Sequence, residues 1–362
     1  MTADLDATVT WTLAHAWHSD SDHAALDVCA AELAKLGIGF AGTSDLAEAN
    51  AVKMHGFEII DALRASKPRL ADLRGVAASQ GWSSLLDPRA LSFMGHGGAV
   101  FGIPLNLHQS NCLWANKGST AVIDAAHSQT PMNLDAWLRQ AATRIAKPLA
   151  VGSESWQIGI LFESLALTVL GAESYEEAFV QLSAGALGGR AMAEVLERLK
   201  GLREFVDDER IALPWRDQLA AVNAGDAAAM VMGDWVSAAP PANVQRLHVD
   251  GFRGETIFVV DFFVPVLHGG VDLAERVAVA LTGPDFQTRF SAVKGSTPAV
   301  LRAQQTRNPS DLRIDAPSLT FDQCCSVTTK ARLLDIVADH FIHRRDSART
   351  ATALASAAQA ST

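Results

Sequence analysis

Segments with strand patterning alternate with segments of helical period along most of this chain, and this alternation constrains its fold most strongly. Apolar and β-branched residues at 7–17 and 37–44 predict strands, whereas 23–36 and 58–65 carry apolar residues at helical spacing. A strong strand pattern at 255–266 is again followed by a helical one. Strands that alternate with helices predict an α/β protein in which mixed sheets are flanked by helices.

The length of the chain predicts two lobes. Its 362 residues exceed the usual span of one domain, about 100–200 residues. Polar and Gly-containing sequence near 112–118 predicts the first passage of the chain from one lobe to the other. The predicted divisions are an N-terminal lobe at 1–112 plus about 260–292, a C-terminal lobe at 118–255 plus about 293–349, and an Ala/Ser/Thr-rich tail at 350–362.

Charge and hydropathy exclude several classes of partner. The net charge of −10 and the lack of a basic run argue against nucleic acid, so we expect a small neutral ligand. The longest apolar stretch, 160–171, carries Glu163 and is too short to span a membrane. The first eleven residues lack the basic and apolar regions of a secretory signal. The four cysteines lack the spacing of a metal site.

Motifs that would indicate catalysis are missing from the sequence. It contains no G-x-S-x-G elbow, H-E-x-x-H pair, phosphate-binding loop or dinucleotide fingerprint. One polar cluster follows the first predicted strand, and its members are His15, Trp17, His18, Asp20, Asp22 and His23. No second ligand group completes a metal site there, so a solvated turn with one or two ligand contacts is the preferred interpretation.

Tryptophan usage favours carbohydrate binding. The chain has eight tryptophans and a single tyrosine. Sugars present apolar C–H faces that stack on indole rings, together with hydroxyls that need polar partners. Four tryptophans stand beside polar residues at predicted strand ends or loops: Trp17, Trp114, Trp156 and Trp235. Core packing explains any one of them equally well.

Three stretches carry a resemblance to a known family. They are GIPLNLHQSNCLWANK at 102–117, AVGSESWQIGILFESLALTVLG at 150–171 and AGDAAAMVMGDWV at 224–236, with weaker support from VVDFF at 259–263 and FSAVKGSTPAV at 290–300. In this order they resemble the glucose/mannose-type solute-binding proteins of ABC sugar importers, solute-binding protein family 1 of the maltose-binding-like class. The resemblance implies a two-lobed periplasmic-binding-protein fold of type II, with strands crossing between lobes and the sugar between them.

The resemblance also implies a set of ligand contacts. Matched position by position, they are Trp17, His108, Asn111, Trp156, Gln157, Trp235, Asp261 and Lys294. Carboxylate and amide oxygens accept hydrogen bonds from sugar hydroxyls, ammonium and amide groups donate them, and indole rings cover a sugar face. Asp261 has the strongest independent argument, because a carboxylate inside an apolar strand is costly unless it is paired or faces a ligand.

The sequence departs from the family pattern at other positions of the family's binding site. The family's tandem tryptophan is Ala16–Trp17 here, and the loop at 41–49 is shortened. Val52 and Met54 stand where the family has Gln and His, with His55 shifted by one position. Phe321 replaces a ligand-contacting histidine. Because several polar contacts are lost, we expect a ligand other than glucose.

These features are compatible with three functions. The leading one is the solute-binding component of a bacterial ABC sugar importer: a periplasmic, monomeric, non-enzymatic protein that needs no metal or cofactor and delivers its sugar to permease subunits with their ATPase. The alternative is a cytoplasmic or diverged sugar-binding sensor or regulator, which the absence of a recognisable signal and the altered cleft favour. An enzyme rests only on the cluster at 15–23.

Overall fold

The computed structural model describes residues 9–67, 69–126, 133–247, 255–304 and 314–360. The chain divides into two compact units: unit 1 is Met1–His108 with Val259–Arg307, and unit 2 is Gln109–Phe258 with Asn308–Thr362. Parts of the predicted first strand (7–8), of the lobes (248–254 and 305–313) and of the tail (361–362) lie outside the described residues.

Unit 1 is built on a mixed sheet. Its strands follow the spatial order β11–β6–β10–β3–β1–β2. β1 pairs in parallel with β2 and β3, whereas β10 pairs antiparallel with β3, and β11 antiparallel with β6. The bounds are β1 (Thr10–Ala14), β2 (Gly39–Thr43), β3 (Ala51–Met54), β6 (Ile103–Gln109), β10 (Glu255–Pro265) and β11 (Thr297–Pro298), with a hairpin of β4 (Gly95–His96) and β5 (Ala99–Val100).

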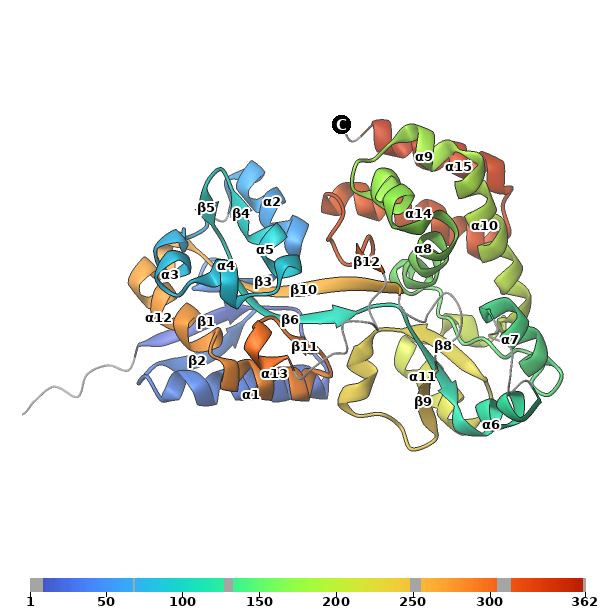
Figure 1. The fold of residues 1–362 in the computed structure, drawn as a ribbon, viewed down its shortest axis with the longest axis horizontal. Helices are drawn as coiled ribbons and strands as arrows, with labels where there is room; N and C mark the ends of the chain where they lie inside the picture. Colours follow the sequence, from blue (N-terminus) through green and yellow to red (C-terminus); the bar gives the residue numbers. More distant parts are fainter. Residues whose placement is uncertain (1–8, 68, 127–132, 248–254, 305–313, 361–362) are drawn as a thin grey trace, which may run out of the picture. The chain divides into compact units, whose positions relative to one another are not determined.

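Helices cover both faces of this sheet. Figure 1 shows α1 and α13 on one side of it and α2, α4 and α5 on the other. Adjacent residues of β10 explain this, since Phe262 lies near Ile59 of α2, whereas the ring of Phe263 lies 5.9 Å from that of Trp11 and 5.8 Å from that of Trp17. The helices are α1 (Asp20–Ala34), α2 (Gly56–Ala65), α3 (Arg74–Ser79), α4 (Trp82–Leu85), α5 (Pro88–Met94), α12 (Val271–Leu281) and α13 (Pro284–Lys294).

Unit 2 is mainly helical. A small sheet has β7 at its centre with β8 and β9 antiparallel on either side, and β12 pairs in parallel with residues 255–258 of β10. Its strands are β7 (Cys112–Asn116), β8 (Ala229–Met232), β9 (Val244–Leu247) and β12 (Ile314–Pro317). Its helices are α6 (Lys117–Ala126), α7 (Leu134–Ala142), α8 (Ser155–Phe179), α9 (Ala184–Gly188), α10 (Arg190–Leu202), α11 (Trp215–Ala224), α14 (Val327–His343) and α15 (Ser347–Gln359).

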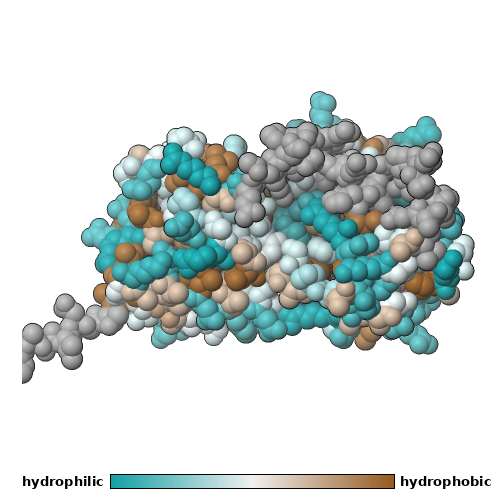
Figure 2. All heavy atoms as spheres, turned by 60° about the horizontal axis from the view of Figure 1, so that its bottom comes forward, coloured by the Kyte–Doolittle hydropathy of each residue, from teal (hydrophilic) through white to brown (hydrophobic). Residues whose placement is uncertain are grey.

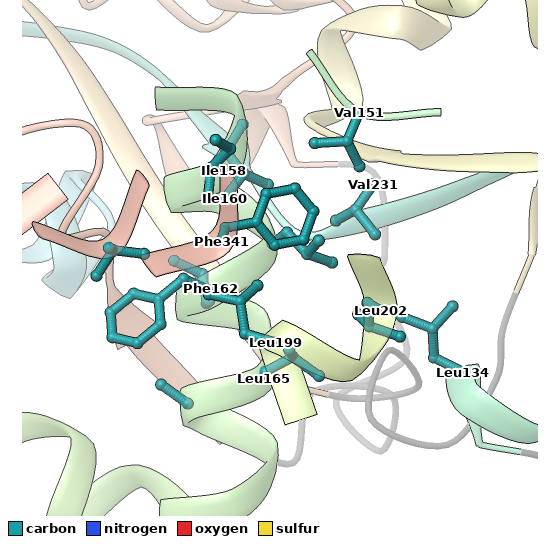
Figure 3. Close-up of a cluster of buried hydrophobic side chains, with 14 of the residues drawn as sticks. Leu134, Val151, Ile158, Ile160, Phe162, Leu165, Leu199, Leu202, Val231 and Phe341 are labelled. Carbon is teal, nitrogen blue, oxygen red and sulfur yellow. The ribbon is translucent and has the colours of Figure 1, made fainter. Parts of the chain in front are cut away.

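Helix α8 forms the centre of the core of unit 2. Its residues Ile158, Ile160 and Phe162 gather with Leu199 of α10 and Phe341 of α14 (Figure 3). By length and composition α8 could cross a membrane. The apolar stretch at 160–171 alone is too short to do so. However, 61% of the apolar window of α8 is buried inside the structure, as in the core helix of a globular unit. The exposed apolar residues lie in small separate groups on the face drawn in Figure 2.

The units differ from the predicted divisions in three places. The first division follows His108 rather than lying near 112–118, because β7 pairs with β8 and β9 inside unit 2. Residues 293–304 belong to unit 1, where β11 pairs with β6. The predicted tail begins inside the packed helix α15, which buries Ala351, Leu354 and Ala358.

Candidate functional site

The eight predicted ligand residues divide equally between the units. Trp17, His108, Asp261 and Lys294 lie in unit 1, and Asn111, Trp156, Gln157 and Trp235 lie in unit 2. Each unit therefore carries its own cluster. We call Trp17, Asp22, Lys53, His55, His108, Asp261 and Lys294 the Asp261 cluster, and Trp156, Trp235 and Phe321 the Trp235 cluster.

Asp261 is a buried carboxylate surrounded by nitrogen groups. It lies on β10 with 3% of its surface exposed. The distance from its Oδ1 is 3.0 Å to Nζ of Lys53 and 3.3 Å to Nε2 of His55, while Oδ2 lies 3.6 Å from Nε2 of His108. Adjacent strands explain this convergence, because β10 is flanked by β3, which ends beside His55, and by β6, which carries His108.

The charges of this cluster compensate one another. Burial favours the neutral form of Asp261, but nearby Lys53 and a hydrogen bond from His55 overcome that effect and hold the pKa of Asp261 well below its usual range. Glu58 behaves similarly: burial opposes its charge, yet the hydrogen bond and charge of His55 lower its pKa to about 2. The carboxylates thus stay ionised at neutral pH.

Lys294 joins the cluster from the end of α13. Its Nζ lies 2.5 Å from Oδ1 of Asp22 and 4.2 Å from the ring centroid of Trp17. Asp22 also belongs to the capping box of α1 with Ser19. The Trp17 ring contacts those of Phe263 and Phe290 as well. Trp17 is therefore partly core and partly the support of an ammonium group, which is a cation–π geometry.

Lys53 and His55 were not among the predicted ligand residues. Because β3 alternates its side chains, Lys53 shares a face with His55 at the end of the strand, opposite to that of Val52 and Met54. Val52 and Met54, two of the positions at which the sequence departs from the family, are therefore not the positions that meet Asp261. The period of the strand, applied from His55 backwards, places Lys53 on the same face as His55, but it does not give the register that brings both to Asp261.

The Trp235 cluster is a group of three half-buried aromatic rings. The centroid of Phe321 lies 5.5 Å from that of Trp235, edge to face, and 6.3 Å from that of Trp156. Gly233 makes room for Trp235, since a Cβ there would lie 2.0 Å from the ring atom Cζ3. Trp114, also noted in the sequence, is a core residue whose Nε1 donates to the carbonyls of Met232 and Gly233.

The two amides predicted as ligand contacts make hydrogen bonds within unit 2. Oδ1 of Asn111 accepts from the backbone N–H of Ile257 at 2.8 Å and from Nε2 of Gln109 at 3.2 Å. Oε1 of Gln157 accepts from the N–H of Gly152 at 3.1 Å, and its Nε2 donates to Glu154 at 2.5 Å. Their positions are therefore fixed by the fold, and their contact with a ligand stays a prediction.

The polar cluster at 15–23 forms the turn into α1. Nδ1 of His15 accepts from the backbone N–H of Trp17, and burial is the main cause that lowers the pKa of His15. Asp22 is engaged by the helix cap and by Lys294, while His18 and His23 are exposed. This arrangement fits the interpretation of a turn that contributes one or two groups to a site.

Known proteins that are similar in sequence to this chain are named as binding proteins. A probable sugar-binding periplasmic protein of Rhizobium meliloti is 30% identical over 337 residues, covering 86% of this chain and 78% of the relative. One of the same name from Brucella suis is 29% identical over 340 residues, covering 86% and 76%. An uncharacterised ABC transporter extracellular-binding protein of Pyrococcus horikoshii is 27% identical over 207 residues, covering 55% and 46%.

Solved structures share the fold. A chitin oligosaccharide binding protein superposes with a TM-score of 0.78 at 16% identity, covering 98% of this chain and 99% of that one. The bacterial solute receptor AcbH, described as preferring β-D-galactopyranose, gives 0.79 at 13% identity, covering 98% of each chain. No family model matches the sequence. The similarity to the Rhizobium protein along most of both chains nevertheless shows the family: this chain belongs to the sugar-binding periplasmic proteins.

Proposed function

We propose that this chain is the solute-binding component of an ABC importer, which captures a neutral sugar outside the cytoplasmic membrane and delivers it to permease subunits with their ATPase. Relatives named as sugar-binding periplasmic proteins and as an ABC transporter extracellular-binding protein support this proposal. They are binding proteins, which supports a non-enzymatic role, and they give no support to the alternative of a sensor or regulator.

The Asp261 cluster is the observation that best supports a neutral sugar as the ligand. It offers two carboxylates, two ammonium groups and two imidazoles beside an indole ring. Asp261 is matched with Lys53, and Asp22 with Lys294, so the cluster contains no large excess of either charge. Groups of this kind exchange hydrogen bonds with hydroxyls, and a charged ligand would have to disrupt ion pairs that are already made. A polyhydroxylated neutral molecule fits best.

The Trp235 cluster supports a sugar other than glucose. Phe321, which replaces a polar residue of the family pattern, packs against Trp156 and Trp235, and its ring has no atom that makes a conventional hydrogen bond. A sugar hydroxyl left without a partner costs about 1–3 kcal/mol. We therefore propose that the ligand presents an apolar face to these rings. Monomeric action without metal or cofactor completes the proposal.

A thermal-shift panel tests this function. The purified chain is melted with glucose, galactose, mannose, xylose, maltose and raffinose, and with glucuronate and glucose 6-phosphate as acidic controls. We expect a neutral sugar to raise the melting temperature, because a ligand at about 100 times its Kd stabilises the fold by about 2.7 kcal/mol. Stabilisation by the acidic sugars alone would contradict the neutral ligand, and no shift with any sugar would contradict sugar binding.

A further inference from the structure

Glu163 is a carboxylate buried in the middle of helix α8, with 0% of its surface exposed. Three donors reach it from two other segments of unit 2. The hydroxyl of Ser110 donates to Oε1 at 3.0 Å, that of Ser318 lies 3.1 Å from Oε1 and 3.0 Å from Oε2, and the N–H of Thr320 donates to Oε2 at 3.1 Å. Glu163 therefore joins the segment before β7 to the segment after β12.

These donors are neighbours of the proposed sugar contacts. Ser110 precedes Asn111, and both are tied to Ile257 of β10, whose carbonyl accepts from the Ser110 N–H at 2.8 Å. Ser318 accepts from the N–H of Phe321 at 3.1 Å, and Phe321 packs against the rings of the Trp235 cluster. The carboxylate of Glu163 thus acts on Asn111 through the neighbouring Ser110, and on Phe321 through Ser318.

We propose that Glu163 is a positioning residue for the sugar-binding groups of unit 2, and that gain or loss of its proton rearranges the hydrogen bonds that hold Phe321 and Asn111. The arrangement of the Trp235 cluster then depends on pH. The consequence for sugar affinity rests on the proposed function, whereas the rearrangement itself does not.

The two charge states require different hydrogen bonds. Ionised Glu163 accepts from Ser110, Ser318 and Thr320 at once, so all three donors point at it. Protonated Glu163 must itself donate to a hydroxyl oxygen, and that hydroxyl needs another acceptor. Ser110 has one at hand, since its Oγ lies 3.4 Å from the carbonyl of Ile257. Protonation therefore moves a hydrogen bond from the carboxylate to β10.

The surroundings place this exchange near neutral pH. Burial, opposed by the hydrogen bonds from Thr320, Ser110 and Ser318, raises the pKa of Glu163 to about 7. The titratable groups that interact with it are Tyr175 on α8 and Cys324 beyond β12; burial raises both pKa values well above the usual range, so both stay neutral.

Two ionisable groups on the neighbouring helix α14 are engaged with other partners. Lys330 pairs with Asp322 at 2.8 Å, and Nε2 of His340 lies 2.9 Å from the carbonyl of Leu196. Asp315 on β12 is exposed. Glu163 itself, with its pKa raised to about 7, is expected to change charge between pH 6 and 8.

The ligand-free test is a pH titration of the near-ultraviolet circular dichroism of tryptophan from pH 5 to 9. We compare the wild type, Glu163→Gln and Glu173→Gln; Glu173 is an exposed glutamate of α8 that follows the kink at Gly171. The difference between the wild-type and Glu163→Gln curves should show a transition centred near pH 7, because the amide cannot ionise, whereas the difference between the wild-type and Glu173→Gln curves should be flat. A wild-type and Glu163→Gln difference that does not change with pH would overturn the proposal.

The ligand arm uses the sugar that stabilises best in the thermal-shift panel. We expect wild-type affinity to fall severalfold from pH 8 to pH 6, and the affinity of Glu163→Gln to vary less and to match that of the wild type at low pH. The two proteins differ at this one residue, so the difference between their profiles isolates Glu163. If the affinities of the wild type and Glu163→Gln change with pH in the same way, Glu163 is not a positioning residue. If no sugar in the panel binds, the proposed function is overturned, whereas the dichroism test still decides whether Glu163 controls the hydrogen bonds.

Discussion

Asp261 stays charged inside an apolar strand because its neighbours supply the solvation that water would otherwise give. Desolvation alone would favour the protonated acid, but Lys53 and His55 more than compensate. In the proposed site, ligand hydroxyls would meet groups whose positions the fold has already fixed, and such a site is preorganised. Substitution of one residue at a time separates the contribution of that residue to sugar binding from its contribution to stability.

Asp261→Asn is expected to weaken sugar binding by tenfold or more and to destabilise the fold by about 1–3 kcal/mol, because Lys53 loses a buried charged partner. Calorimetric titration measures the first effect and urea unfolding the second. Asp285→Asn, at an exposed aspartate of α13, is the matched control and should change neither. Unaltered affinity in Asp261→Asn would remove Asp261 from the binding site.

Gly233→Ala tests the placement of the Trp235 ring. The φ of Gly233 is −68°, which alanine adopts without strain, so the main effect is the overlap of the new Cβ with the indole. We expect a change in tryptophan fluorescence and at least a tenfold loss of sugar affinity.

Gly201→Ala is the control for this substitution. Gly201 lies in α10, and an added Cβ there would meet nothing within 4 Å. It should leave the tryptophan signal and the affinity unchanged and stabilise the helix by about 0.5–1 kcal/mol. If Gly233→Ala also binds sugar normally, Trp235 is not a ligand platform.

At the scale of elements, periodic segments were predictable and short ones were not. The strand expected at 37–44 is β2, and that at 255–266 is β10. The expected helix at 23–36 is α1, which begins earlier because Ser19 caps it. β9 and β12, with four residues each, were missed because so short a segment has too little periodicity, and their pairing depends on distant partners.

The sequence predicted the types of residue in the candidate site better than the contacts between them. The apolar surroundings of Asp261 indicated a paired or ligand-facing carboxylate, and the structure shows it paired. Lys53 was missed because its partner lies more than 200 residues away in the sequence, on β10, and local patterning carries no record of that register. Glu163 was noted only as an interruption of an apolar stretch, although its burial marks it as a structural centre of unit 2.

Helix α15 gives a prediction at this scale. Low complexity suggested a tail, but Asp346 caps the helix, Leu354 is buried, and the hydroxyl of Thr350 lies 3.0 Å from Nδ1 of His340. Leu354→Ala should destabilise the chain by about 2–5 kcal/mol in urea unfolding. Exposed Thr352→Ala should be nearly neutral. Equal stability of the two variants would show that α15 does not contribute to the packed core.

For the whole molecule, the perturbed carboxyl groups predict how stability depends on pH. Folding lowers the pKa of Asp22, Glu58 and Asp261, so the stabilisation from their charge is present at neutral pH and is lost as pH falls below about 4 toward the folded values. Glu163 acts in the opposite sense: its folded pKa of about 7 exceeds the ordinary 4.5, so its stabilisation is lost as pH rises from about 4.5 to 7.

Thermal unfolding between pH 3 and 9 checks both signs. The melting temperature of the wild type should fall on acidification below pH 4. The difference between Glu163→Gln and the wild type should grow in favour of the variant from pH 5 to pH 8, because the variant never carries the buried charge. A difference that stays constant with pH would contradict the assignment of the raised pKa to Glu163.

A chain with the fold and sequence of the sugar-binding periplasmic proteins is expected to bind a neutral sugar through the Asp261 cluster. Isothermal titration calorimetry of the purified wild type and of Asp261→Asn, with the sugar that stabilises the chain best, tests it most directly. We predict one sugar per chain with a Kd in the micromolar range or below for the wild type, and at least tenfold weaker binding for Asp261→Asn. No binding heat with any neutral sugar, or equal affinity of the two proteins, would contradict the claim.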